Sequence, residues 1–320
     1  MSSDFSYLIE KIRNAEFRTE PFKHIYIEDF FDEKHFAELS QSPEINLSEQ
    51  NSDPELFDAL DSAGYKAIEF PGCITDRKKY MTWRQSDRKK SRSSSTEGFG
   101  MTLRLYEPKS KIVKEVKDFV TGPEFNLAIA EKFNLDFGAC KVDGGIQKYL
   151  DGYEISPHPD IRRKAATFMV NINPSEKSAA ANHHTHYMAF RSERTYVRSF
   201  WEGNPKIDRC WVPWDWCDTK YQQTANNSIV IFAPADDTIH AVKASYDHLV
   251  TQRTQLYGNL WYKSVEIDKS LPWEQVDLLN QRSLSLAKGG LKSAIPVPVK
   301  RRLKKLQKAL TSSNSVGQRN

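Results

Sequence analysis

The sequence predicts an α+β protein with a mainly β core, arranged as a double-stranded β-helix (a jelly roll) with flanking helices. Three observations predict it. From about residue 139 the chain breaks into short β-like segments separated by Gly, Pro, Asn and Asp. Before that point, apolar residues recur at helical spacing. After residue 270 the text becomes helical again and strongly basic. We therefore expect a supporting segment over 1–138, a β core over 139–265, and a C-terminal helix and basic tail over 266–320.

Composition indicates a soluble globular protein, since 39% of the 320 residues are hydrophobic and 28% are charged. No run of eighteen apolar residues occurs, so no membrane-spanning helix is expected. The first residues carry acidic groups and lack an apolar stretch, which argues against a signal peptide. The four cysteines show no CxxC spacing and are expected to be reduced thiols. These features together predict a cytoplasmic protein.

The net charge of +4 is unevenly distributed. From Lys288 onward there are nine Lys or Arg and no Asp or Glu, so the rest of the chain sums to −5 by subtraction. A mildly acidic body makes nucleic acid an unexpected partner.

Helices and strands alternate in the first 138 residues. A helix is expected over 3–17 after a Ser/Asp cap, a strand over 21–31, and a capped helix over 32–43. Residues 48–100 are polar and punctuated, and 75–100 is the most loop-like stretch. Residues 107–135 predict two helices separated by Gly122-Pro123.

The β core is predicted from short segments spaced along the chain. They are 139–150, 166–173, 186–191, 195–201, 208–214, 227–234, 240–246 and 255–262. Thr167 and Asn171, both on the second of these segments, are candidates to face the interior of the roll.

One constellation of polar residues in this core has the chemistry of a metal site. His158 and Asp160 are two apart, so on an extended segment they project to one face. His240 follows eighty residues later, after the apolar strand over 227–234. A second imidazole from a neighbouring strand would complete a set of two histidines and one carboxylate. Such a set suits Fe(II) and leaves three coordination positions open.

The order of HxD, a long gap, His and then Arg253 resembles the Fe(II)/2-oxoglutarate-dependent dioxygenases. The text QKYLDGYEISPHPDIRRKAATFMVNINP is most similar to their prolyl-4-hydroxylase-like branch. The resemblance implies that His158, Asp160 and His240 bind iron and that Arg253 pairs with the distal carboxylate of 2-oxoglutarate. It places Tyr149 near the co-substrate, although a core aromatic accounts for that residue equally well. Lys243 is the nearest competitor of Arg253, and Gln255 stands where the family commonly has a small hydroxyl.

The resemblance also implies the reaction. An enzyme of this class hydroxylates an unactivated C–H bond and forms succinate and CO2. Halogenases of the family lack the carboxylate ligand, so Asp160 favours hydroxylation. No catalytic residue beyond the metal ligands is expected. The long segments around the core favour a small-molecule or glycan substrate over a peptidyl proline, which stays an alternative.

Two other classes of protein remain open. A cupin-like metal enzyme shares the jelly roll but usually carries clustered histidines and no carboxylate anchor. A non-catalytic roll that binds carbohydrate is the second. His183, His184 and His186 form a histidine-rich tract that we expect to be a surface loop, outside the metal set.

The tail combines a leucine stripe with basic residues. Six Lys or Arg lie among 300–308, on a predicted helix over 299–310. Such a helix is either a solvated terminus or a peripheral contact with the inner face of an anionic membrane.

Overall fold

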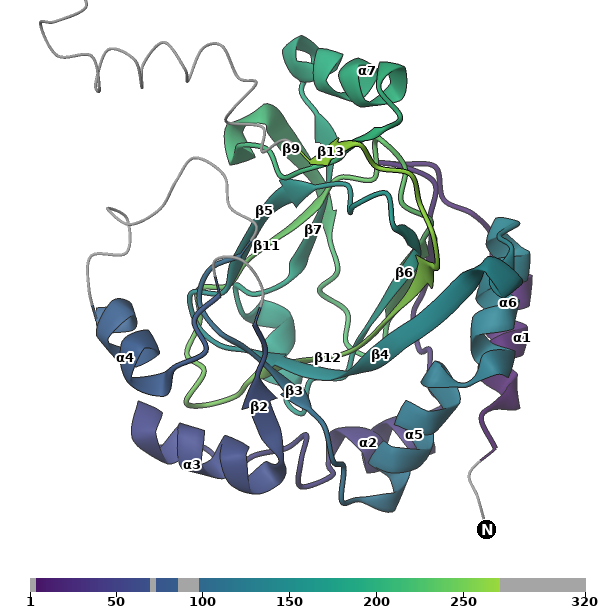
Figure 1. Cartoon of the computed structure of the whole chain (residues 1–320). Helices are drawn as coiled ribbons and strands as arrows, with labels where there is room; N and C mark the ends of the chain where they lie inside the picture. Colours follow the sequence, from purple (N-terminus) through teal and green to yellow (C-terminus); the bar gives the residue numbers. More distant parts are fainter. Residues whose placement is uncertain (1–3, 70–72, 86–97, 271–320) are drawn as a thin grey trace, which may run out of the picture. The chain divides into compact units, whose positions relative to one another are not determined.

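A seven-stranded antiparallel sheet forms the larger part of the β core (Figure 1). The computed structural model describes residues 4–69, 73–85 and 98–270, which all belong to one unit spanning Met1–Leu271. In spatial order the strands of this sheet are β1 (Ile25–Ile27), β10 (Ile229–Phe232), β6 (Lys164–Asn171), β12 (Arg253–Tyr262), β4 (Cys140–Tyr149), β3 (Thr102–Leu105) and β2 (Tyr65–Ala67). Three of its strands therefore come from the segment before residue 138.

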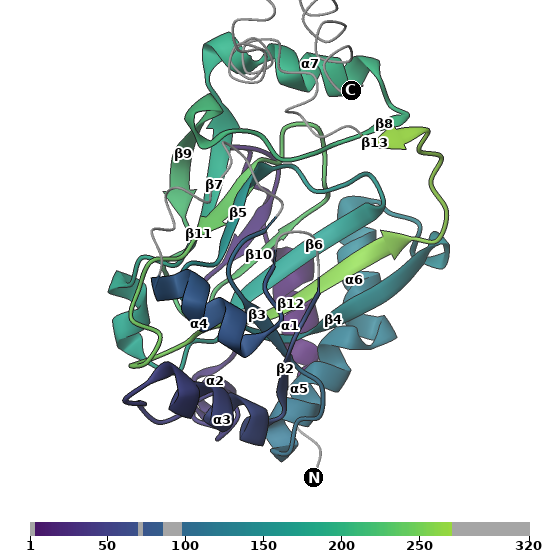
Figure 2. The same cartoon turned by 60° about the vertical axis from the view of Figure 1, so that its left-hand side comes forward.

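A four-stranded antiparallel sheet lies opposite (Figure 2). Its order is β5 (Glu154–His158), β11 (His240–Lys243), β7 (Thr185–Phe190) and β9 (Cys217–Gln222). Two short strands, β8 (Ile207–Asp208) and β13 (Lys269–Ser270), pair in parallel apart from both sheets. The structure thus has the mainly antiparallel β core that the sequence predicts, while its jelly-roll connectivity stays a prediction.

Helices cover the outer face of the large sheet. The helices that precede β4 are α1 (Ser6–Asn14), α2 (Glu33–Ser40), α3 (Asp53–Ala63), α4 (Arg77–Gln85), α5 (Lys111–Thr121) and α6 (Pro123–Phe133), and α7 (Tyr196–Gly203) follows β7. Of these, α5 packs on β4 and β12, and α3 packs on β2. Asp32 caps α2 by accepting a hydrogen bond from the His35 N–H at 2.7 Å. Short 3₁₀ turns lie at Phe137–Ala139, Glu176–Ala180, Ser192–Arg194 and Trp214–Trp216.

Alternate side chains of β12 point to opposite faces of the large sheet, one packed against the helices and the other lining a cavity. Leu256 and Leu260 pack into the hydrophobic core beneath α5 and α6. Gln255, Tyr257 and Asn259 face the opposite way and line a cavity. Side chains alternate between the two faces of a strand. With Leu256 and Leu260 fixed in the core, the polar residues between and beside them must therefore point toward the cavity.

Two local predictions are wrong. The segment 195–201 was expected to be a strand but forms α7, whose Val197 and Trp201 lie four apart and are both buried. The stretch 75–100, expected to be the most loop-like, contains α4, and the polar residues before it contain α3 and β2. Ser52, Pro54 and Gly64 delimit α3 as helix-end residues, with Gly64 in the left-handed conformation.

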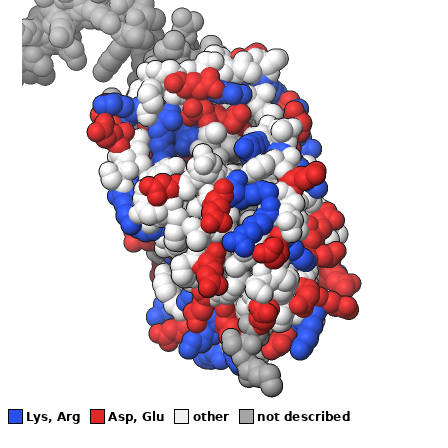
Figure 3. All heavy atoms as spheres, turned by 90° about the vertical axis from the view of Figure 1, so that its right-hand side faces the viewer, with Lys and Arg blue, Asp and Glu red and all other residues white. Residues whose placement is uncertain are grey.

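None of the described helices combines the length and apolar character that a membrane span requires. On the face that Figure 3 shows, Lys and Arg side chains are interspersed with Asp and Glu. The predicted basic helix over 299–310 lies wholly outside the described residues, and the segment assigned to 266–320 lies mostly outside them. The three-part division of the chain therefore stays a prediction.

Candidate metal centre

The strand register brings the two histidines together. β5 and β11 are antiparallel neighbours, and His158 and His240 are direct partners in their register. Their ring centroids lie 4.2 Å apart. The prediction that the second imidazole comes from a neighbouring strand is therefore confirmed, at the end of β5 and the start of β11.

Asp160 reaches the same point by a different route from the one expected. β5 ends at His158, and Asp160 has a positive φ of 62° in the left-handed region. Aspartate tolerates this conformation better than most residues. The pairing of His158 with Asp160 thus comes from a turn through Pro159 and not from strand alternation, which is a correction to the sequence interpretation.

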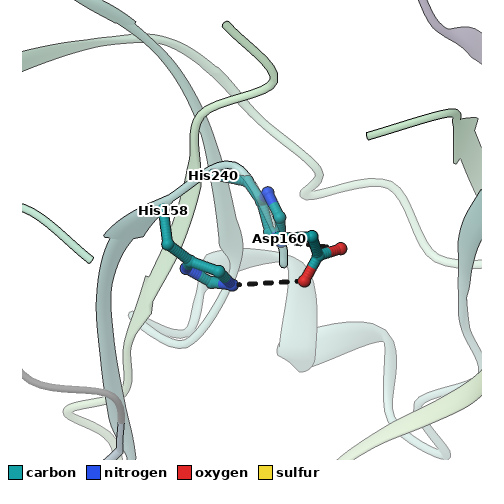
Figure 4. A group of neighbouring side chains, drawn as sticks. All are labelled: His158, Asp160 and His240. Carbon is teal, nitrogen blue, oxygen red and sulfur yellow. Dashed lines mark ion pairs between the residues drawn. The ribbon is translucent and has the colours of Figure 1, made fainter. Parts of the chain in front are cut away.

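The three side chains converge (Figure 4). His158 Nε2 lies 3.6 Å from Asp160 Oδ1, and His240 Nε2 lies 3.9 Å from Asp160 Oδ2. One potential ligand atom from each residue lies within 4.8 Å of the others. Two ligands held by one ion at about 2.1 Å are at most about 4.2 Å apart, so both measured separations can be bridged.

Backbone carbonyls orient both imidazoles for this role. His158 Nδ1 lies 2.9 Å from the Ser156 oxygen, and His240 Nδ1 lies 3.0 Å from the Thr238 oxygen. A carbonyl only accepts, so Nδ1 carries the proton and donates, which leaves the Nε2 lone pair free. Each ring therefore presents a basic nitrogen to the shared point, as metal-binding histidines do.

Electrostatics favour the ionisation states that a metal needs. Burial, followed by the neighbouring His158 ring, lowers the pKa of His240 to about 3, so this imidazole is neutral at physiological pH. Burial raises the pKa of the Asp160 carboxyl, but Lys164 and the two imidazoles bring it well below its usual value. Lys164 Nζ donates to Asp160 Oδ1 at 2.7 Å, and Thr167 Oγ1 donates to Oδ2 at 2.8 Å.

The centre opens into a cavity of about 360 Å³ lined by residues of both sheets. His158, Asp160 and His240 all contribute to its wall. Thr167, which the sequence placed near the site, lies beside them, whereas Asn171 does not line the cavity. The volume suits a small ligand.

Arg253 is a buried cation with an unused donor. Only 2% of the residue is exposed, and its Nη2 donates to Thr185 Oγ1 at 2.8 Å. Its Nη1 has no hydrogen-bond partner within the described parts of the chain. Arg253 and Tyr149 are direct partners on β12 and β4, and the guanidinium carbon lies 4.6 Å from the Tyr149 ring centre. Burial lowers the pKa of Arg253, but a guanidinium stays charged at neutral pH.

The competitor Lys243 is elsewhere engaged. Its side chain is 48% exposed, and its Nζ lies 3.8 Å from Glu154 Oε1. Neither Lys243 nor Arg253 is among the residues that line the cavity, but Thr185 and Tyr149, which both contact Arg253, are.

The histidine-rich tract is not the surface loop that the sequence predicted. His183 is fully buried and His184 nearly so, and the rings of both bond to backbone oxygens of the preceding 3₁₀ turn. None of the three histidines, His183, His184 or His186, lines the cavity.

Several residues of the site escaped sequence reasoning. Thr185 lies within the histidine tract and accepts the hydrogen bond from Arg253. Lys164 bonds Asp160, and Arg209 and Asn259 line the cavity. Asn259 could have been found by counting in steps of two along β12 from Arg253, since such residues share a face of the strand. No local pattern marks Arg209.

Comparisons with known proteins gave structural similarities only. No family model matches the sequence, and no curated protein matches it. The structure of a Pseudomonas putida prolyl-4-hydroxylase is similar over 81% of this chain and 98% of its own, at 9% identity and a TM-score of 0.41. A Trichoplax adhaerens prolyl hydroxylase, in complex with a hypoxia inducible factor peptide fragment, is similar over 81% of this chain and 89% of its own, at 9% identity and a TM-score of 0.38.

A third similar structure is the epimerase SnoN in complex with Fe³⁺, alpha ketoglutarate and nogalamycin RO. It is similar over 80% of this chain and 83% of its own, at 9% identity and a TM-score of 0.38. At these values the similarities establish no activity for this chain, and its function is inferred from the side chains of the site.

Proposed function

We propose that this chain is an Fe(II)- and 2-oxoglutarate-dependent oxygenase that hydroxylates an unactivated C–H bond of a small-molecule or glycan substrate. The observation that carries the proposal is the convergence of His158, Asp160 and His240, with both Nε2 atoms free and both Nδ1 atoms bonded to backbone. Two imidazoles and one carboxylate are the donor set of non-haem Fe(II) oxygenases.

The donor set fits a divalent ion. The Asp160 carboxylate supplies one negative charge, and His240 is neutral with its proton on Nδ1, so an ion would meet no proton on its Nε2. His158, Asp160 and His240 would hold the ion, while Thr167 and the backbone oxygens of Ser156 and Thr238 would keep the ligands oriented.

Arg253 fits the co-substrate. A buried guanidinium with a partnerless Nη1 is costly unless an anion completes its hydrogen bonds. The distal carboxylate of a keto acid matches this planar donor set in a bidentate manner. Thr185 and the Tyr149 ring hold the guanidinium in position for that contact.

When bound, iron would allow 2-oxoglutarate and O2 to supply the oxidising chemistry, with one oxygen atom entering the product, the other entering succinate, and CO2 released. The chain contributes binding, orientation and exclusion of water. Pro159 and Phe168 contribute carbon atoms to the cavity wall beside the metal ligands, and Val242 adds to the same wall. Such a wall keeps bulk water from the reacting carbon and lowers the local dielectric.

Anaerobic addition of Fe(II) and then 2-oxoglutarate to the purified full chain tests the proposal. A weak visible charge-transfer band should appear only when both are present. In Arg253→Gln the 2-oxoglutarate concentration for half-maximal band should rise about 100-fold, since a charged, bidentate contact is lost. Arg198→Gln is the matched control, because Arg198 is half exposed and pairs with Glu202.

The same titration separates the alternatives. A cupin-like enzyme would bind the metal without responding to the keto acid, and a carbohydrate-binding roll would bind neither tightly. Absence of the band in wild-type protein that retains its fold by circular dichroism would refute the oxygenase. Arg253→Lys, which keeps the charge but not the fork, serves if the glutamine variant fails to fold.

A further inference from the structure

Several residues that line the cavity carry buried polar atoms without a hydrogen-bond partner among the described residues. Five buried atoms of lining residues have no hydrogen-bond partner among the described residues: Arg104 Nε, Arg209 Nε, Trp211 Nε1, the Tyr257 hydroxyl and Gln255 Oε1. Three of them can only donate, the hydroxyl can do both, and the amide oxygen alone is restricted to accepting. Buried polar groups are normally satisfied, so this wall suits a ligand rich in acceptors.

Arg209 is a buried cation without a close ion pair. Its side chain is 4% exposed, and its Nη1 lies 3.7 Å from Asp236 Oδ1, beyond hydrogen-bond distance. Asp236 is also shared with Arg162, whose Nη1 lies 3.4 Å from the same oxygen. One carboxylate therefore faces two guanidiniums, and neither pair has the geometry of a close charge-assisted bond.

The charges around the cavity also leave a surplus of cations. The lining residues include three cations, Arg104, Lys164 and Arg209, against two carboxylates, Asp143 and Asp160. Arg104 Nη1 lies 3.8 Å from Asp143, and Lys164 Nζ bonds Asp160. A divalent ion on Asp160 would repel the Lys164 ammonium and weaken that bond. Lys164 would then lack a close anion, and Arg209 would keep its 3.7 Å contact with Asp236, which it shares with Arg162.

We propose that the substrate is an anion whose carboxylate or phosphate is bound by Arg209, with Trp211 Nε1–H and Lys164 as further donors. Its role as substrate rests on the proposed oxygenase function, whereas the anion site does not. The site is distinct from Arg253, which bonds Thr185 and does not line the cavity. The class that results is an acidic small molecule, including acidic or phosphorylated sugars, and not a neutral peptide segment.

Titration with inorganic sulfate tests the site without knowledge of the substrate. The full chain is saturated anaerobically with Fe(II) and 2-oxoglutarate, and sulfate is added at constant ionic strength in a calorimeter. Wild-type protein should bind sulfate saturably in the millimolar range or tighter. Arg209→Gln should weaken binding at least tenfold, while Arg198→Gln, an exposed arginine outside the cavity, should leave it unchanged. Equal binding by wild type and Arg209→Gln, or no saturable binding, would overturn the proposal.

Two conservative variants protect the test against misfolding. Arg209→Lys keeps the charge beside Asp236, and Trp211→Phe keeps the ring while removing the indole N–H. Each should weaken sulfate binding about threefold or more with an unchanged circular dichroism spectrum. Sulfate affinities that stay at the wild-type value in both would show that these side chains only pack the wall.

Paired compounds then distinguish the two sources of negative charge. Carboxylic acids are compared with their primary amides, and phosphate monoesters with their alcohols, by succinate release. Only the acidic member of a pair should be turned over. Half-saturation should need at least tenfold more of that acid in Arg209→Gln, while half-saturation by the keto acid co-substrate should be unchanged. Equal turnover of the neutral member would count against the proposal.

Failure of the two proposals is distinguishable. A charge-transfer band without sulfate binding would overturn the anion site and leave the oxygenase. Sulfate binding that depends on Arg209, without the band, would overturn the oxygenase and leave the anion site.

Discussion

His158 and His240 present Nε2 to a shared carboxylate, whereas His183 and His184, just before β7, use Nε2 to bond backbone oxygens. All four residues are mainly buried, and both pairs have their rings close together, with centroids 4.2 Å and 4.6 Å apart. Ring proximity alone therefore does not make a metal site. The ring nitrogens left free also differ, Nε2 in His158 and His240 but Nδ1 in His183, although either nitrogen can bind a metal.

Charge adds to this difference. Asp160 lies between the first pair of histidines, and no carboxylate was found with the second pair in a metal-binding group among the described residues. Arg253 lies close enough to the second pair to lower the pKa of His183, after burial, which is the larger cause. A divalent ion near His183 would therefore meet a positive field and, among the described residues, no carboxylate ligand.

Replacing one histidine of each pair should give the largest difference in Fe(II) affinity between the two pairs. His158→Ala should weaken Fe(II) binding by at least about 100-fold, because loss of a ligand exceeds the 10- to 100-fold that outer-shell changes cost. His184→Ala should change it less than about threefold. Anaerobic calorimetric titration measures both. Similar losses in the two variants would mean that the tract takes part in metal binding.

The candidate metal centre could be predicted from the sequence because three residues at recognisable spacing, two histidines and an aspartate, carry the chemistry of such a site. His158, Asp160 and His240 were named correctly as a cluster, yet the reason given for Asp160 was wrong. The turn at Pro159 could not be predicted, since period-two alternation also accounts for the pair. Arg253 was named because the resemblance implies a basic residue on the strand after His240, and it is the first residue of β12.

What lay beyond sequence reasoning depends on contacts between distant segments. Burial of His183 is set by packing against Tyr246 and by the turn at Ser178. The stretch from Tyr196 resembles a strand because of its aromatic and β-branched residues, but tertiary burial of Trp201 selects a helix. Arg209 reaches the cavity from the loop after β8, which no local pattern predicts.

The buried tract should carry an acid-stability signature that the protein without metal reveals. Burial lowers the pKa of His183 to about 2, so the unfolded chain binds the proton first as the pH falls below about 6.5. The contribution of His183 to the free energy of unfolding is therefore complete above pH 6.5. Below that pH it decreases by up to about 1.4 kcal/mol per pH unit. In His183→Phe the slope between pH 6.5 and 4.5 should be shallower by about that amount.

Urea denaturation at a series of pH values, with chelator present, measures this slope. Fe(II) affinity at neutral pH is the control and should be unchanged in His183→Phe. The comparison uses slopes, so a uniform loss of stability from the larger ring does not affect it. Parallel stability curves for wild type and variant would show that His183 is protonated in the folded protein.

The smallest expected effect, on the affinity for 2-oxoglutarate, concerns Thr185, the residue of the histidine-rich tract that bonds Arg253. Thr185 Oγ1 accepts from Arg253 Nη2 at 2.8 Å, whereas the histidines on either side bond elsewhere. Thr185→Val removes the acceptor at nearly constant volume and should cost about 1 kcal/mol of guanidinium positioning. The 2-oxoglutarate concentration for half-maximal charge-transfer band should rise about fivefold, with Fe(II) affinity unchanged. Thr185→Ser should restore most of it, since the hydroxyl is kept. If valine and serine behave alike, Arg253 is held by the Tyr149 ring and its burial alone, and the tract has no part in binding the keto acid.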